Sequence, residues 1–318
     1  MSINEAIIRF LEYCELDKNL SLKTVRMYGY YLQFFQGWLL KSEKSKIKTE
    51  KDDFEVEDID EETIRNFRLY LSHGYKNPFK GELKRQTQNY FLVAIRSLLR
   101  YLIKQKVKVI SPDMIELGKE RDRNIKYLNS ESLQRLFNAV TPDKLQGVRD
   151  RAILEVLFST GLRVSELVSL NRYQINIRSG EISVVGKGGK RRVVFLSKKA
   201  KEKLNQYLLK RTDPYKPLFI RSSGPKPPAG LTDEKLRLSV RSVERLVEKY
   251  RKKAGLVDRV GPHALRHSFA TDLLEQGADI RYVQEMLGHK NISTTQVYTH
   301  VTNRQLKEIH EKYHSGNR

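Results

Sequence analysis

Apolar side chains recur every three or four positions over long stretches of this chain, and this spacing predicts a mainly helical fold. One such run, which Ser21 is placed to cap, consists of Val25, Tyr28, Leu32, Phe35 and Leu39. A second run consists of Leu92, Ile95, Leu99 and Leu102. The first hundred residues are therefore expected to form one all-helical domain.

The helical spacing is lost over residues 108–125, where a Ser-Pro pair is followed by the charged stretch K-E-R-D-R-N. A chain of 318 residues is long enough for two domains, so we place the domain boundary in this stretch. The predicted division is an N-terminal helical domain over 1–107, a linker over 108–125 and a second domain over 126–318.

The second domain is expected to combine helices with a small hairpin. One helix should begin at Asn129 or Ser130, and another should end near Gly161, a residue type that favours helix ends. Two β-prone segments, 181–185 and 191–196, flank G-K-G-G-K, which predicts a hairpin with a mobile, glycine-rich tip. The domain is therefore expected to be mixed α/β.

Further breaks in the helical spacing mark expected loops and helix ends. The acidic run over 50–62 is interpreted as a solvated loop that leads into a helix at Thr63. The stretch S-S-G-P-K-P-P-A-G over 222–230 is expected to be a surface loop. Later helices are expected to stop at Gly255, Gly277 and Gly288.

The charge of the chain favours an anionic partner. Lysine and arginine number 60 against 38 aspartate and glutamate, a formal net charge of +22. Nucleic acid is the leading candidate, because neutralised phosphates release counterions, although charge alone does not exclude a merely basic protein. One cysteine, Cys14, precludes an internal disulfide. With no apolar run near the ~20 residues that cross a bilayer and no signal peptide, a cytoplasmic protein is expected.

Six residues of the second domain form a set suited to breaking a phosphodiester bond without a metal: Arg163, Lys187, His263, Arg266, His289 and Tyr298. Negative charge builds on the oxygens of an attacked phosphate, so cationic donors must already be in place. Arginine suits this task, because its planar guanidinium binds two phosphate oxygens and stays charged. Arg163, just beyond the Gly161 helix end, and Arg266 are the candidates, although a single arginine is more often a surface ion-pair residue.

Tyr298 is the candidate nucleophile, since attack by its hydroxyl gives a phosphotyrosine that keeps the bond energy for rejoining. A tyrosine hydroxyl ordinarily has a pKa of about 10, so a base or nearby positive charge must ease its deprotonation. His263, which shares a helix face with Arg266, is the candidate base, and His289 is a candidate donor to the phosphate. Most of the 16 tyrosines must instead pack in cores.

Lys187 lies in the expected hairpin tip, from which a lysine can reach the leaving 5′ oxygen and give it a proton. A solvated turn lysine is the plain alternative. The motif G-x-x-x-x-G-K-[ST] is absent, which excludes an ATPase of that type. Neither H-E-x-x-H nor paired cysteines occur, so a zinc site is disfavoured, and no metal or cofactor is expected. His267, a lone histidine, is expected to be structural.

The segments that carry these residues resemble, in order and spacing, those of the tyrosine recombinase (phage integrase) family, and most closely its Xer branch. They are S-T-G-L-R-V-S-E-L, V-V-G-K-G-G-K-R-R, P-H-A-L-R-H, L-G-H and S-T-T-Q-V-Y-T-H. The resemblance implies that the six residues match the family's active-site positions, and that Glu166 matches an acid that supports Arg163. It also implies cleavage and rejoining of DNA through a 3′-phosphotyrosine.

The family's architecture implies an N-terminal helical core-binding (SAM-like) domain and a C-terminal catalytic domain that grip opposite faces of duplex DNA. Residues suited to reading or positioning the DNA grooves are Lys23, Thr24, Arg26, Arg85, Gln86, Gln88, Arg241, Arg245 and Lys249. The last segment of the chain resembles a helix that docks on a neighbouring protomer. A homo- or hetero-tetramer on DNA is therefore expected, formed by exchange of this C-terminal helix.

Four functions are compatible with this resemblance. The first is a recombinase of the Xer type that resolves chromosome dimers at a dif-like site, with a second recombinase and a DNA translocase as possible partners. The second is an integrase or transposase of a mobile element, which the absence of a preceding arm-binding domain disfavours. A type IB topoisomerase would use the same tyrosine. A non-catalytic DNA-binding protein would require the six positions to be coincidental.

Overall fold

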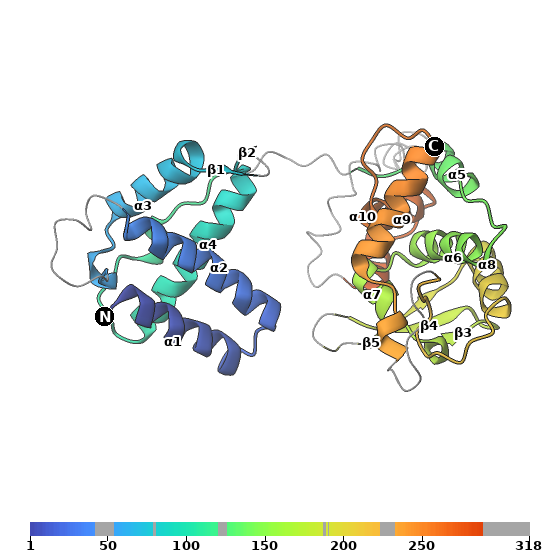
Figure 1. Cartoon of the computed structure of the whole chain (residues 1–318), viewed down its shortest axis with the longest axis horizontal. Helices are drawn as coiled ribbons and strands as arrows, with labels where there is room; N and C mark the ends of the chain where they lie inside the picture. The colour runs from blue at the N-terminus through green and yellow to red at the C-terminus, as the bar shows by residue number, and fades with distance from the viewer. Residues whose placement is uncertain are drawn as a thin grey trace, which may run out of the picture. The chain divides into compact units, whose positions relative to one another are not determined.

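The computed structural model describes residues 1–41, 54–78, 81–119, 126–186, 189, 191–222 and 233–288. The chain forms two compact units, Met1–Arg123 and Asn124–Arg318, and each has its own set of helices (Figure 1). Each unit also has its own apolar core. The fold is mainly helical, as predicted, with two small antiparallel sheets in the described regions.

The described part of the first unit contains four α-helices and a short hairpin. The helices are α1 (Ile3–Leu16), α2 (Leu22–Leu39), α3 (Glu61–Leu69) and α4 (Arg85–Lys104), and the hairpin pairs β1 (Lys76–Asn77) with β2 (Gly81–Glu82). The predicted cap is confirmed, since the Ser21 hydroxyl accepts from the Thr24 backbone N–H at 3.3 Å. The capping residue of α3 is Asp60, so that helix begins two residues before the predicted start at Thr63.

The core of the first unit is rich in aromatic side chains. Phe35, Phe67 and Phe91 are fully buried, and the Phe35 and Phe67 rings lie 4.7 Å apart between centroids. Cys14 is buried in α1, and burial raises the pKa of its thiol. Rings of this size bury enough apolar area to stabilise a small helical unit.

Two segments that the sequence placed in loops pack on this core. Val56 and Ile59, within the acidic run, are almost fully buried, so the prediction of a wholly solvated loop is wrong for the described part of that run. The stretch after α4 also returns to the core, where Ile115 is buried. The Asn89 side chain fixes this return, because it donates to Gly118 O at 2.8 Å and accepts from Gly118 N at 3.0 Å.

The second unit contains seven helices and one sheet within the described ranges. The helices are α5 (Ser130–Asn138), α6 (Leu145–Thr160), α7 (Val164–Ser169), α8 (Lys198–Leu209), α9 (Val240–Lys253), α10 (Pro262–Glu275) and α11 (Ile280–Leu287). The strands are β3 (Ile175–Asn176), β4 (Glu181–Val185) and β5 (Arg191–Phe195). The predicted starts and stops at Asn129, Gly161, Gly255, Gly277 and Gly288 are all confirmed to within a residue or two.

The predicted hairpin is confirmed, with β4 and β5 antiparallel and Ile182 opposite Val194. Its side chains alternate, so that Ile182, Val184 and Val194 lie in the apolar core. A short third strand, β3, extends the sheet beside β4 and was not predicted. Most of the hairpin tip lies outside the described residues, as does the predicted loop over 222–230 apart from Ser222.

Helix α6 lies at the centre of the second unit, between α8 and α10 (Figure 1). It is buried on all sides, which a helix tolerates only when its polar side chains have internal partners. Arg149 and Asp150 form such a pair at 2.7 Å, and the Tyr250 hydroxyl donates to the second Asp150 oxygen at 3.0 Å. These contacts join α6 to α9.

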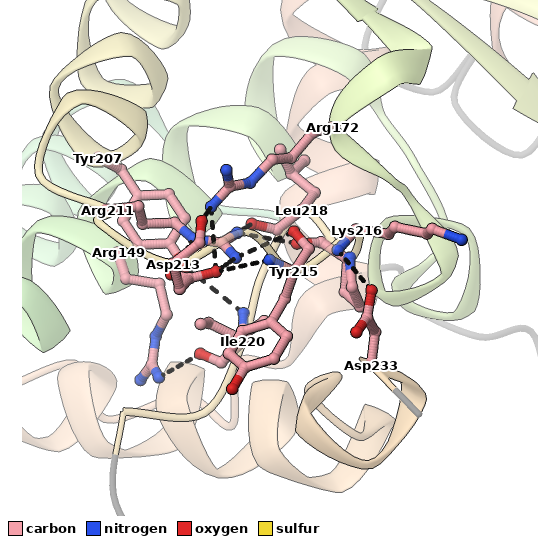
Figure 2. A network of polar contacts seen from close by, with 11 residues as sticks. Arg149, Arg172, Tyr207, Arg211, Asp213, Tyr215, Lys216, Leu218, Ile220 and Asp233 are labelled. Atoms are coloured by element: carbon pink, nitrogen blue, oxygen red, sulfur yellow. Dashed lines mark hydrogen bonds and ion pairs between the residues drawn. The ribbon is translucent and has the colours of Figure 1, made fainter. Parts of the chain in front are cut away.

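A polar network fixes the chain that follows α8 (Figure 2). The Arg211 guanidinium donates to Pro217 O at 2.8 Å and to Leu218 O at 2.7 Å. The Asp213 carboxylate pairs with Arg211 and accepts from Arg172 at 3.1 Å. Buried backbone carbonyls of an irregular segment need hydrogen-bond donors. Here the two arginines supply these donors, which a neighbouring strand would supply in a regular sheet.

None of the described helices is long and apolar enough to cross a membrane.

Candidate active site

Arg163 lies at the junction between α6 and α7. Gly161 ends α6 in the left-handed conformation, with φ of 59°, and Arg163 is the residue that caps α7 two positions later. A Cβ atom at Gly161 would lie 2.4 Å from the Phe269 ring, so no other residue fits there without displacement. The close approach of α10 and the tight turn therefore fix where the Arg163 side chain begins.

Glu166 holds Arg163 in place through two contacts. Its Oε2 accepts from the Arg163 backbone N–H at 2.8 Å, and its Oε1 accepts from Arg163 Nη1 at 3.0 Å. The supporting role that the resemblance implied for Glu166 is thus matched by direct contact, although its part in catalysis stays a prediction. The Arg163 side chain remains 33% exposed, so it is open to a ligand.

A third residue, Arg192 of β5, completes this cluster and was missed by the sequence reasoning. Its Nη1 lies 2.9 Å from Glu166 Oε1 and its Nη2 lies 2.8 Å from Oε2. In β5, the side chain of Arg192 is on the same side as the buried Val194. That alternation was a usable signal, because an arginine on the inward side of a strand needs an anionic or carbonyl partner.

Glu166 is 6% exposed, yet its carboxyl is held in the charged form. Burial by itself raises its pKa, but hydrogen bonds from Arg192 and from the Arg163 backbone, together with the charges of both arginines, outweigh burial and lower the pKa. Two guanidinium groups share one carboxylate, so the cluster keeps an excess positive charge.

Arg266, from α10, lies at the other side of the α6–α7 junction. It is buried at 3% exposure, and its guanidinium donates to Gly161 O at 2.6 Å and to Leu287 O at 2.7 Å. It therefore ties the end of α6 to the end of α11. The structure brings Arg163 and Arg266 together, since Arg266 binds the carbonyl two residues before Arg163.

His263 is exposed in the first turn of α10, one turn before Arg266, and Pro262 is the first residue of that helix. His267 follows on the same helix and is partly buried. Burial, with smaller contributions from the charges of His263 and Arg266, lowers the pKa of His267 to about 4. His267 is therefore neutral near pH 7, in keeping with the structural role predicted for it.

Three predicted site residues, Lys187, His289 and Tyr298, lie outside the described residues, as does the C-terminal segment expected to dock on a neighbour. In the described parts of the chain, no group of three or more His, Cys, Asp or Glu side chains could hold a metal ion.

The groove-reading candidates of α9 share one exposed face. Arg241, Arg245 and Lys249 are spaced by four residues and all three are exposed, while Val243, Val247 and Tyr250 of the same helix are buried. The helix thus presents a cationic face to solvent and an apolar face to the core.

The candidates of the first unit lie at the starts of α2 and α4. Lys23, Arg26 and Arg85 are exposed, and Thr24 and Gln86 are partly exposed. Gln88 is instead 8% exposed, and its amide donates to Leu83 O at 3.0 Å and accepts from Arg85 at 3.2 Å. The prediction that Gln88 reads DNA is not supported, because its hydrogen-bonding groups already hold the start of α4.

Comparison with known proteins places this arrangement in a family. Residues 126–305 match the Phage integrase family, and residues 7–106 match the N-terminal SAM-like domain of phage integrases. The chain belongs to the phage integrase family. It is a tyrosine recombinase of the Xer type, and such enzymes cleave and rejoin DNA. The predicted fold class, a SAM-like helical domain with a mixed α/β catalytic domain, is confirmed.

This recombinase is similar to curated relatives over nearly its whole length. Tyrosine recombinase XerC of Thermodesulfovibrio yellowstonii is 37% identical over 97% of this chain and 95% of its own. Tyrosine recombinase XerD of Listeria innocua is 34% identical over 98% of this chain and 99% of its own. A solved structure of XerH site-specific recombinase bound to difH substrate, a pre-cleavage complex, has a TM-score of 0.69 at 26% identity and covers 95% of this chain and 83% of its own.

Proposed function

We propose that this recombinase resolves chromosome dimers by recombination at a dif-like site. Relatives named XerC and XerD that match it over nearly their full length, and the similarity to XerH bound to difH, support this substrate. The excess of 22 positive charges supports binding to duplex DNA of whatever sequence.

The single observation that carries the chemistry is the convergence of arginines on the α6–α7 junction. Arg163 and Arg192 share the Glu166 carboxylate, and Arg266 binds the Gly161 carbonyl beside them. In the proposed mechanism, Arg163 and Arg266 bind the scissile phosphate and stabilise the charge that builds on its oxygens. The guanidinium groups supply fixed positive charge, so no metal or cofactor is required.

The remaining proposed roles follow from side-chain chemistry. Tyr298 attacks the phosphorus, a 3′-phosphotyrosine forms, and the 5′ oxygen leaves with a proton from Lys187. His263 takes the proton of the tyrosine hydroxyl, and His289 donates a hydrogen bond to the phosphate. Attack by a 5′ hydroxyl of the partner strand reverses these steps and releases Tyr298, so each phosphodiester bond broken is replaced by one formed.

We propose that both predicted domains, 1–107 for core binding and 126–318 for catalysis, bind DNA. The first part of the predicted linker over 108–125, up to Gly118, packs on the first unit and is part of it. The exposed face of α9 in the second domain, formed by Arg241, Arg245 and Lys249, is suited to the major groove. A tetramer assembled by exchange of the C-terminal helix, with a second recombinase and a DNA translocase as candidate partners, completes the proposal.

The test is covalent trapping of the recombinase on genomic DNA of its host, followed by sequencing of the attached 3′ ends, with Tyr298→Phe as the control. The expected result is one dominant chromosomal locus that is absent from the control. Ends clustered at the borders of mobile elements would instead identify an integrase, and would overturn the proposed substrate while leaving the chemistry in place.

A further inference from the structure

Arg192 binds two elements of the proposed active site at once. Besides both oxygens of Glu166 on α7, it contacts the end of α11, where its Nε donates to Met286 O at 3.3 Å. The side chain is 14% exposed, so most of the guanidinium lies within the protein. The guanidinium of Arg192 therefore bonds mainly to neighbouring protein groups and little to solvent.

Arg192 limits how many bonds Glu166 makes with Arg163. Arginine and carboxylate prefer a bidentate arrangement, in which two N–H groups meet two oxygens. Here Arg192 takes that arrangement with Glu166, and Arg163 makes only one side-chain bond to the same carboxylate. Among the described residues, the other nitrogens of Arg163 have no partner, so they remain for a phosphate.

Arg192 also holds the end of α11. The last carbonyls of a helix lack partners within the helix, and cations suit that end. Met286 O accepts from Arg192 and Leu287 O accepts from Arg266, so two arginines hold consecutive carbonyls at the end of α11. Gly288 follows with φ of 65°, and a Cβ atom there would lie 3.2 Å from Arg192 Nη1.

We propose that Arg192 is a positioning residue of the recombination reaction, which orients Arg163 toward the scissile phosphate by occupying Glu166 and fixes the end of α11. This inference rests on the proposed function of Arg163. Without Arg192, Glu166 is free to take the bidentate place on Arg163 and to neutralise the charge that the phosphate needs.

The test compares single-turnover cleavage of DNA by the full chain and by variants at position 192. Arg192→Met should cleave on the order of 10- to 100-fold more slowly at saturating DNA, because misplacement of a group by about 1 Å has effects of this size. Arg191→Met is the matched control, since Arg191 is the exposed neighbour on the same strand, and it should cleave at the wild-type rate.

Arg192→Lys keeps the charge but cannot hold both Glu166 oxygens and Met286 O, so it should fold and still cleave slowly. A wild-type rate in either Arg192→Lys or Arg192→Met would overturn the inference. A wild-type chain that forms no covalent adduct on DNA would instead overturn the proposed function, so the two failures are distinguishable.

A double variant separates positioning from a merely structural role. If Glu166 captures Arg163 when Arg192 is absent, then Arg192→Met combined with Glu166→Gln should cleave at least several-fold faster than Arg192→Met alone, since a neutral amide competes weakly for Arg163. A double variant no faster than the single one would mean that Arg192 only supports the fold, and would contradict the proposal.

Discussion

At the scale of single residues, burial separates the two arginines proposed to bind phosphate. Arg163 is 33% exposed and makes one side-chain contact with Glu166, whereas Arg266 is 3% exposed and already donates to two carbonyls. Arg163 is thus placed to meet a ligand by a small movement. Arg266 is fixed by the backbone that surrounds it, so its loss has consequences beyond the reaction.

We expect both Arg163→Ala and Arg266→Ala to slow DNA cleavage far more than DNA binding, but only Arg266→Ala to lower the free energy of unfolding, by roughly 2 kcal/mol. The reason is that Gly161 O and Leu287 O would stay buried without their donor. Urea unfolding of the two variants measures this difference. Equal stabilities would contradict the structural part assigned to Arg266.

His267 gives a prediction about pH. Its pKa is about 4 in the folded chain, against 6.5 ordinarily, so between these values the unfolded chain binds a proton that the folded chain does not. Above pH 6.5 the histidine is neutral in both states and costs no stability. The free energy of unfolding falls as the pH drops from 6.5 toward 4. Allowing for partial exposure of the ring, the loss should be about 1–2 kcal/mol.

The measurement is urea unfolding of the wild type and of His267→Gln at several pH values from 7 to 4. The difference between the two proteins should change over this window, which isolates the histidine from other titrating groups. The lowered pKa of Glu166 makes its own contribution disappear only below 4.5. A constant difference between the proteins across the window would contradict the lowered pKa of His267.

At the scale of elements, the site depends on how α6 ends. Gly161 has φ of 59° and lies against Phe269 and Leu287, so the turn and the packing of α10 and α11 on it are coupled. Gly277 also has a positive φ, of 94°, but nothing lies within 4 Å of a Cβ atom there. Alanine at Gly277 would therefore meet backbone strain alone, whereas alanine at Gly161 would meet backbone strain and a steric clash.

We therefore expect Gly161→Ala to destabilise the chain by about 2–4 kcal/mol and Gly277→Ala by about 1–2 kcal/mol. Both variants lose stability through backbone strain, and only Gly161→Ala also loses stability through overpacking. Urea midpoints compare the two variants. A Gly161→Ala variant as stable as Gly277→Ala would show that Phe269 moves aside without loss.

The exposed face of α9 predicts the salt dependence of binding. A triple variant in which glutamine replaces Arg241, Arg245 and Lys249 should bind DNA more weakly. The slope of log affinity against log salt concentration should become shallower by up to about 3. The control changes three other exposed lysines, namely Lys198, Lys199 and Lys210. An equal effect of both triple variants would contradict a specific role for α9, because only total charge would then matter.

Local patterns were enough to predict the elements, because caps, glycine stops and apolar spacing act over a few residues. Ser21, Gly161 and the β4–β5 hairpin were found in this way. Arg192 was missed because its partners Glu166 and Met286 lie 26 and 94 residues away in the sequence. The network around Arg211 was missed because its bonds to Pro217 O and Leu218 O follow from the irregular path of the folded chain, which carries no local pattern. The burial of Gln88 at the start of α4 and its hydrogen bond to Leu83 O were not foreseen, because both depend on how the chain before α4 folds back.

At the scale of the whole molecule, two units with separate cores are joined in one chain, and each presents cationic side chains to solvent. In the proposed function both units bind DNA, and tethering them raises the effective concentration of the second once the first has bound. The family match over both units shows a recombinase. We propose that the arginine cluster of the second unit supplies the positive charge that its chemistry needs.

We propose that Tyr298 becomes linked to DNA whose scissile phosphate is bound by Arg163 and Arg266. The most direct test of this claim is mass-spectrometric mapping of the residue that carries nucleotide after trapping, in the wild type and in Tyr298→Phe. We predict nucleotide on the peptide that contains Tyr298, and DNA binding without any adduct in the variant. An adduct on another residue, or one that persists in Tyr298→Phe, would contradict the claim.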